Sequence, residues 1–112
     1  MKISISGHSG YAPSGQDIVC AGISTLGQTA AMMFAEMESA GELEVFTAEK
    51  SAGKLLLAIK AYKHTKAMAA GIYSFFCTGA RLIADSYPAN VTFIVDDDLS
   101  SEAGRKTKIK PL

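Results

Sequence analysis

Two long segments of helical periodicity, each bordered by strand-like segments, are the feature that most limits how this chain can fold. Apolar residues recur at helical spacing from Ile18 to a stop near Gly41. They recur again over residues 65–86, where Tyr87-Pro88 ends the pattern because proline cannot continue a helix. Strand patterns precede Gly7, cover residues 42–49 and 55–59 as a hairpin, and return over 91–95. The sequence therefore predicts an α+β fold, with two helices packed on a mixed or antiparallel four-stranded sheet in the order β-α-β-β-α-β.

Length and tail composition indicate one domain with an extension. The 112 residues are enough to bury a core without disulfides or a structural metal. After residue 96 the chain is acidic and then basic and lacks core residues, so we expect a single domain over 1–96 and a polar, flexible tail over 97–112.

The composition also limits where the protein works and what it binds. No apolar run approaches the roughly 18–20 residues that span a membrane, and no secretory signal opens the chain, so a cytoplasmic protein with free thiols is expected. Residues 1–49 hold one base against six acids, and residues 50–112 hold ten bases against five acids. Aromatic residues are not interleaved with the lysines, so no nucleic-acid partner is predicted.

The segment between the first strand and the first helix is the best candidate for chemistry. Residues 7–16 contain three glycines, a proline and two serines and are typical of a loop. Asp17 is a good N-cap, which makes Cys20 the third helical residue and its backbone N–H a donor to the aspartate. The positive end of a helix favours a reactive thiolate, whereas the Asp17 charge opposes it.

His8 stands at the outgoing end of the first strand. A loop of about ten residues brings it to the helix start, where it can serve as the base for Cys20. Ser24 lies one turn after Cys20 on the same face, although a helical serine commonly bonds to its own backbone. Spacing alone leaves the alternative open that Cys20 is a structural thiol and His8 an unrelated surface residue.

The other cysteine, the other histidine and the methionines are expected to have structural roles rather than catalytic or metal-binding ones. Cys77 falls inside an apolar helix and is expected in the core, and His64 is expected at a solvated helix end. Neither the cysteines nor the histidines have a metal-ligand spacing, so no metal or other cofactor is predicted. The methionines are expected to fill the core or an interface.

The residues around Cys20 resemble the ribosomal-processing cysteine protease family Prp. Its signature is a Gly-His-Ala loop, then Gly-x-Asp-Ile-Val-Cys-Ala, and a serine four positions after the cysteine. These elements stand here as Gly7-His8-Ser9, as Gly15-Gln16-Asp17-Ile18-Val19-Cys20-Ala21, and as Ser24. The resemblance is specific in spacing as well as in residue identity.

The resemblance implies a cysteine endopeptidase with a Cys-His dyad. His8 carries over as the base and Cys20 as the nucleophile, while Asp17 and Ser24 carry over as supporting positions. The substrate-gating loop corresponds to Ser9, Gly10, Gly15 and Gln16. The implied substrate is the N-terminal extension of a large-subunit ribosomal protein or a phage capsid or scaffold protein, and the implied assembly is a homodimer.

Two departures suggest a divergent or phage-encoded member. Ser9 replaces the alanine after the histidine, and the chain starts at what would be the second strand of the family. The competing hypothesis is a non-catalytic dimeric binding or assembly module that retains the protease fold. A further alternative, thiol redox sensing at Cys20, has no resolving cysteine close in sequence.

Overall fold

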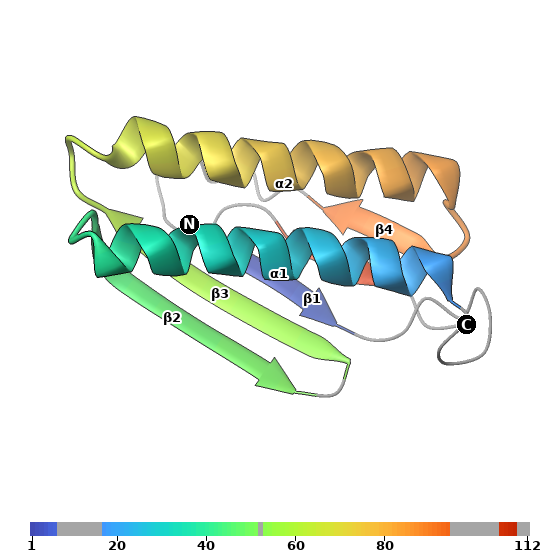
Figure 1. Cartoon of the computed structure of the whole chain (residues 1–112). Helices are drawn as coiled ribbons and strands as arrows, with labels where there is room; N and C mark the ends of the chain where they lie inside the picture. The colour runs from blue at the N-terminus through green and yellow to red at the C-terminus, as the bar shows by residue number, and fades with distance from the viewer. Residues whose placement is uncertain (7–16, 52, 95–105, 110–112) are drawn as a thin grey trace.

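A computed structural model describes residues 1–6, 17–51, 53–94 and 106–109 of the chain. The helices are α1 (Ile18–Ser39) and α2 (Lys66–Ser86). The strands are β1 (Lys2–Ser6), β2 (Leu43–Ser51), β3 (Lys54–Ala61), β4 (Val91–Ile94) and β5 (Lys106–Ile109). Figure 1 shows the two helices side by side and antiparallel, covering one face of the strands. The α+β class, both helices and the central hairpin are as the sequence predicts.

The main sheet has three antiparallel strands in the order β1-β3-β2. β3 is central, with Ile3 opposite Leu57 on one side and Ala48 opposite Leu57 on the other. The hairpin between β2 and β3 contains Gly53 at φ 69°, a left-handed conformation that glycine adopts without steric cost. The register shifts between Leu43 and Val45, near the start of β2.

The structure does not confirm the prediction of a single four-stranded sheet. β4 pairs with β5 in a separate two-stranded antiparallel ladder, and β5 lies against β1. β5 falls within residues 97–112, where the sequence predicts a flexible tail. Its four residues, Lys-Thr-Lys-Ile, include a single apolar one, so the sequence carries little strand signal there.

The core lies between the helix layer and the strands. Its largest fully buried side chains are Phe34, Phe76, Ile3, Ile23, Leu57 and Val19. α1 approaches the sheet most closely at Gly27, where a Cβ atom would lie 2.6 Å from Ile5 Cδ1 and 2.8 Å from Leu55 Cδ2. This close approach explains a glycine in the middle of a helix, where it otherwise costs about 1 kcal/mol relative to alanine.

Both helices are long and apolar enough to cross a membrane by length and composition, a test that the core helices of soluble proteins also pass. The sequence-based expectation of no membrane segment is therefore not tested by this criterion. In this structure the buried residues of both helices belong to the core described above.

Candidate active site

The start of α1 is held by a side-chain cap. Asp17 has extended backbone angles (φ −84°, ψ 98°), and its Oδ1 accepts a hydrogen bond of 2.9 Å from the backbone N–H of Cys20. Its carbonyl oxygen accepts the first helical hydrogen bond, 3.0 Å from the N–H of Ala21. The prediction that Asp17 is the N-cap and Cys20 the third helical residue is confirmed.

The first turn of α1 places its three side chains in different environments. Val19 is buried and anchors the turn in the core, while Ile18 is 59% exposed. Cys20 lies between these extremes: it is a free thiol, partly buried, and packs against the edge of the core. This setting holds the thiol in place and leaves part of it accessible to a reactant.

β1 runs toward the end of the molecule at which α1 starts (Figure 1). The sequence predicts this arrangement, because it is what would bring the residue after β1 to the thiol. His8 and the predicted gating residues Ser9, Gly10, Gly15 and Gln16 lie outside the described residues. Of the predicted site residues, the structure therefore places Asp17, Cys20 and Ser24.

Ser24 lies one turn after Cys20 and is exposed. Its hydroxyl has no hydrogen-bond partner within the described part of the chain, so it does not bond back to its own helix there. The next residue does so instead, since the Thr25 hydroxyl donates to the Ala21 carbonyl oxygen at 2.8 Å. The Ser24 hydroxyl is thus left for a substrate or for a residue of the site.

The backbone donors of this turn differ in their availability. The N–H of Cys20 is occupied by Asp17. Helix geometry leaves the N–H groups of Ile18 and Val19 without an intrahelical acceptor. In the first turn, the N–H groups of Ile18 and Val19 are therefore backbone donors that the helix itself does not use.

The other candidates hold structural positions, as the sequence predicts. Cys77 is buried in α2, with 5% of its surface exposed. His64 is exposed, and its ring stacks on Tyr62 with centroids 5.7 Å apart. Across the described residues, His, Cys, Asp and Glu form no cluster of three that could hold a metal ion.

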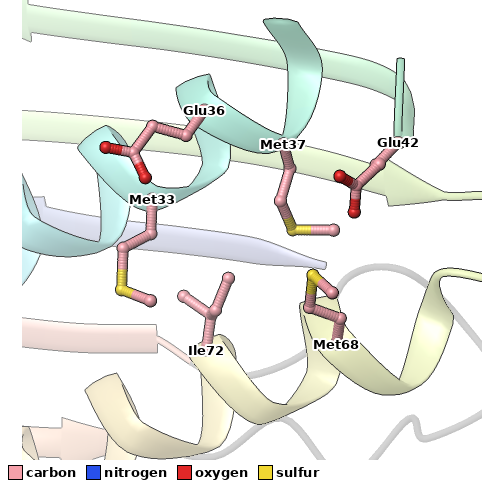
Figure 2. Close-up of a pocket in the computed structure, with 6 residues that line it drawn as sticks. All are labelled: Met33, Glu36, Met37, Glu42, Met68 and Ile72. Carbon is pink, nitrogen blue, oxygen red and sulfur yellow. The ribbon is translucent and has the colours of Figure 1, made fainter. Parts of the chain in front are cut away.

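Sequence reasoning missed a hollow of about 240 Å³ between the two helices. Figure 2 shows Met33 and Met37 of α1 and Met68 and Ile72 of α2 directed toward the same space, with Glu36 and Glu42 beside it. The four-residue spacing within each apolar pair was the available signal. What it could not show is that the two pairs meet, because that depends on how the helices pack.

A two-layer α+β domain with a partly accessible cysteine in the first turn of a capped helix has the features of a thiol-dependent enzyme. The family comparison makes this class specific. The model of the cysteine protease Prp family matches residues 1–92, most of the chain, and the protein belongs to this family. Searches among curated proteins and among solved structures found no match.

Proposed function

We propose that this protein is a cysteine endopeptidase in which Cys20 is the nucleophile and His8 the base. The observation that carries the proposal is the 2.9 Å hydrogen bond from the Cys20 N–H to Asp17, which fixes the thiol in the first turn of α1. Membership in a family of cysteine proteases supports the same chemistry. His8 follows β1 in the sequence, and β1 runs toward the end of the molecule at which α1 begins.

The proposed reaction has two steps. His8 takes the thiol proton, and the Cys20 sulfur attacks the scissile carbonyl carbon; the peptide C–N bond then breaks, and His8 gives its proton to the leaving amine. Water next attacks the thioester carbonyl while His8 accepts a water proton, and the C–S bond breaks to release the acid and the thiol.

Supporting roles follow from the geometry around the thiol. Asp17 positions Cys20 by capping the helix, and the N–H groups of Ile18 and Val19 are the donors proposed for the oxyanion. Ser24 offers the substrate or His8 a hydroxyl that has no hydrogen-bond partner among the described residues. Ser9, Gly10, Gly15 and Gln16 form the proposed gate that a substrate has to displace.

The proposed substrate is the N-terminal extension of a large-subunit ribosomal protein, as the Prp resemblance implies. A phage capsid or scaffold protein is the second candidate substrate. The experiment incubates the purified protein with precursors of both kinds and reads the cut sites by mass spectrometry. One defined cut in one precursor is expected. Cys20→Ala should abolish it, and Cys77→Ala is the matched control that should retain it.

The result also separates catalysis from the competing function, a non-catalytic binding or assembly module. Retention of cleavage by Cys20→Ala would refute the dyad. Binding of a precursor without any cut by the wild-type protein would favour the module. A cytoplasmic location and assembly as a homodimer remain part of the proposal, and the oligomeric state is measurable without a substrate.

A further inference from the structure

The solvent-facing side of the helix pair carries most of the exposed large apolar side chains. We call this surface the outer helix face and define it by five residues with 42–69% of their surface exposed: Met32, Met33, Met68, Phe75 and Leu82. Three of them follow one another at seven-residue intervals along α2. Because seven residues make nearly two full turns, they form one stripe along that helix.

The same helices have almost no charge where they meet solvent. Residues 18–35 of α1 and 67–80 of α2 contain no Asp, Glu, Lys or Arg. The exposed hydroxyls of Thr25 and Thr29 donate to carbonyl oxygens of their own helix, 2.8 and 2.6 Å away. A helix face that stays in water normally carries charged side chains, so this composition is typical of a covered surface.

The outer helix face has both a protruding and a hollow part. Phe75 is 69% exposed. One to two turns before it along α2 lies the hollow of about 240 Å³, whose floor is formed by the nearly buried Met37 and Ile72 and whose rim includes the exposed Met33 and Met68. Methionine side chains adapt to the shape of what they contact, which suits a binding surface.

The area matches what a dimer requires. With roughly 200 Å² for each fully exposed large apolar side chain, the five residues offer on the order of 600 Å². A stable interface buries about 800 Å² per partner, of which about 65%, or roughly 500 Å², is apolar in homodimers.

We propose that the outer helix face binds a second copy of this chain, with the two α2 helices antiparallel about a two-fold axis near Phe75. The stripe is self-complementary in this arrangement, because Met68 and Leu82 are equally far from Phe75 on opposite sides. An isologous interface needs this property, since each residue has to meet its symmetry partner. The outer helix face is thus the surface of the proposed homodimer, and association through it does not depend on peptidase activity.

The charges at the helix ends favour a protein partner over a membrane. They comprise three acids (Glu36, Glu38 and Asp85) and two bases (Lys66 and Arg81). A helix face that binds an anionic lipid surface carries an excess of Lys and Arg, which is missing here.

The proposed interface leaves the thiol uncovered. At about 100° per residue, Cys20 lies about 140° around α1 from Met33. Association through the outer helix face therefore does not cover Cys20, and variants of this face test association separately from the chemistry at the thiol.

The first test measures mass in solution by light scattering. The wild-type protein should have twice the monomer mass of 11.8 kDa. Phe75→Asp should halve the mass by raising the dissociation constant about 30-fold or more, the effect of losing a hot-spot residue. Val45→Asp is the matched control, since Val45 is 45% exposed and pairs with Lys60 on the sheet. It should remain dimeric, and circular dichroism checks that both variants fold.

The second test uses cross-linking in a Cys20→Ala background. Phe75→Cys should form a covalent homodimer under oxidation. Met68→Cys and Leu82→Cys should each fail alone and should cross-link when mixed, which only the antiparallel register predicts. A monomeric wild-type protein, a dimer that survives Phe75→Asp, or cross-linking of Met68→Cys with itself would overturn the proposal. So would Phe75-dependent sedimentation of a monomer with lipid vesicles.

Discussion

The two helices begin in opposite ways. At α1, the Asp17 carboxylate caps the helix through the N–H of Cys20, the cap is partly exposed, and a free thiol sits in the first turns. At α2, Thr65 is 7% exposed and makes no side-chain cap. Its hydroxyl instead donates to the carbonyl oxygens of Glu42, 2.6 Å away, and Tyr62, 3.3 Å away.

This difference separates a chemical role from a structural one. The hydrogen bond from the Thr65 hydroxyl to Glu42 joins the start of α2 to the start of β2. It thereby fixes two elements that are far apart in sequence. Asp17 accepts a hydrogen bond from within its own turn and so positions the residue three places on. The helix cysteines follow the same division, since Cys20 is partly accessible and Cys77 is 5% exposed in the core.

Thiol labelling should show the largest contrast between the helices. In the native protein, iodoacetamide should modify Cys20 on the order of 100-fold faster than Cys77, because Cys77 reacts only after local opening of the core. Mass spectrometry of peptides gives both rates. Denaturant should bring the rates together. Equal rates in the native protein would remove the argument for a positioned and accessible thiol.

Thr65→Val should test the structural role of the α2 start. Valine keeps the shape and removes the donor, which leaves the Glu42 and Tyr62 carbonyl oxygens without this bond. We expect the free energy of unfolding to fall by about 1–2 kcal/mol, measured by urea denaturation. The labelling rate of Cys20 should stay unchanged. A slower rate would show that the two helix starts are coupled and would break the comparison.

The α1 start could be predicted from the sequence because capping is local. The spacing from Asp17 to Cys20 contains the information needed, and the same holds for the helix stop before Pro88. Close packing at Gly27 was also predictable, since a glycine inside an otherwise apolar helix needs a reason.

The parts that depend on distant segments could not be predicted. β5 forms because it pairs with β4, and its lysines and threonine give no strand pattern of their own. The hollow beside Met33 and Met68 depends on how α1 and α2 lie against each other. The role of Thr65 is another case, since its acceptor on Glu42 is 23 residues away.

Glycine substitutions should distinguish the packing of the two helices. A Cβ at Gly27 would overlap Ile5 and Leu55, whereas a Cβ at Gly71 would meet nothing within 4 Å. In a Phe75→Asp background, which removes association from the comparison, Gly27→Ala should lower the unfolding free energy by about 1–2 kcal/mol. Gly71→Ala should raise it by about 0.5–1 kcal/mol. A stabilising Gly27→Ala would contradict the close approach of α1 to the sheet.

Asp17 variants should give the most direct view of the α1 start. Asp17→Ala removes the cap and should cost about 1 kcal/mol of unfolding free energy. Asp17→Asn keeps a good cap while removing a negative charge beside the thiol, so stability should change little and Cys20 should be alkylated faster. If Asp17→Asn instead slows alkylation, the aspartate acts through its charge, for instance on His8, and its role extends beyond the helix cap.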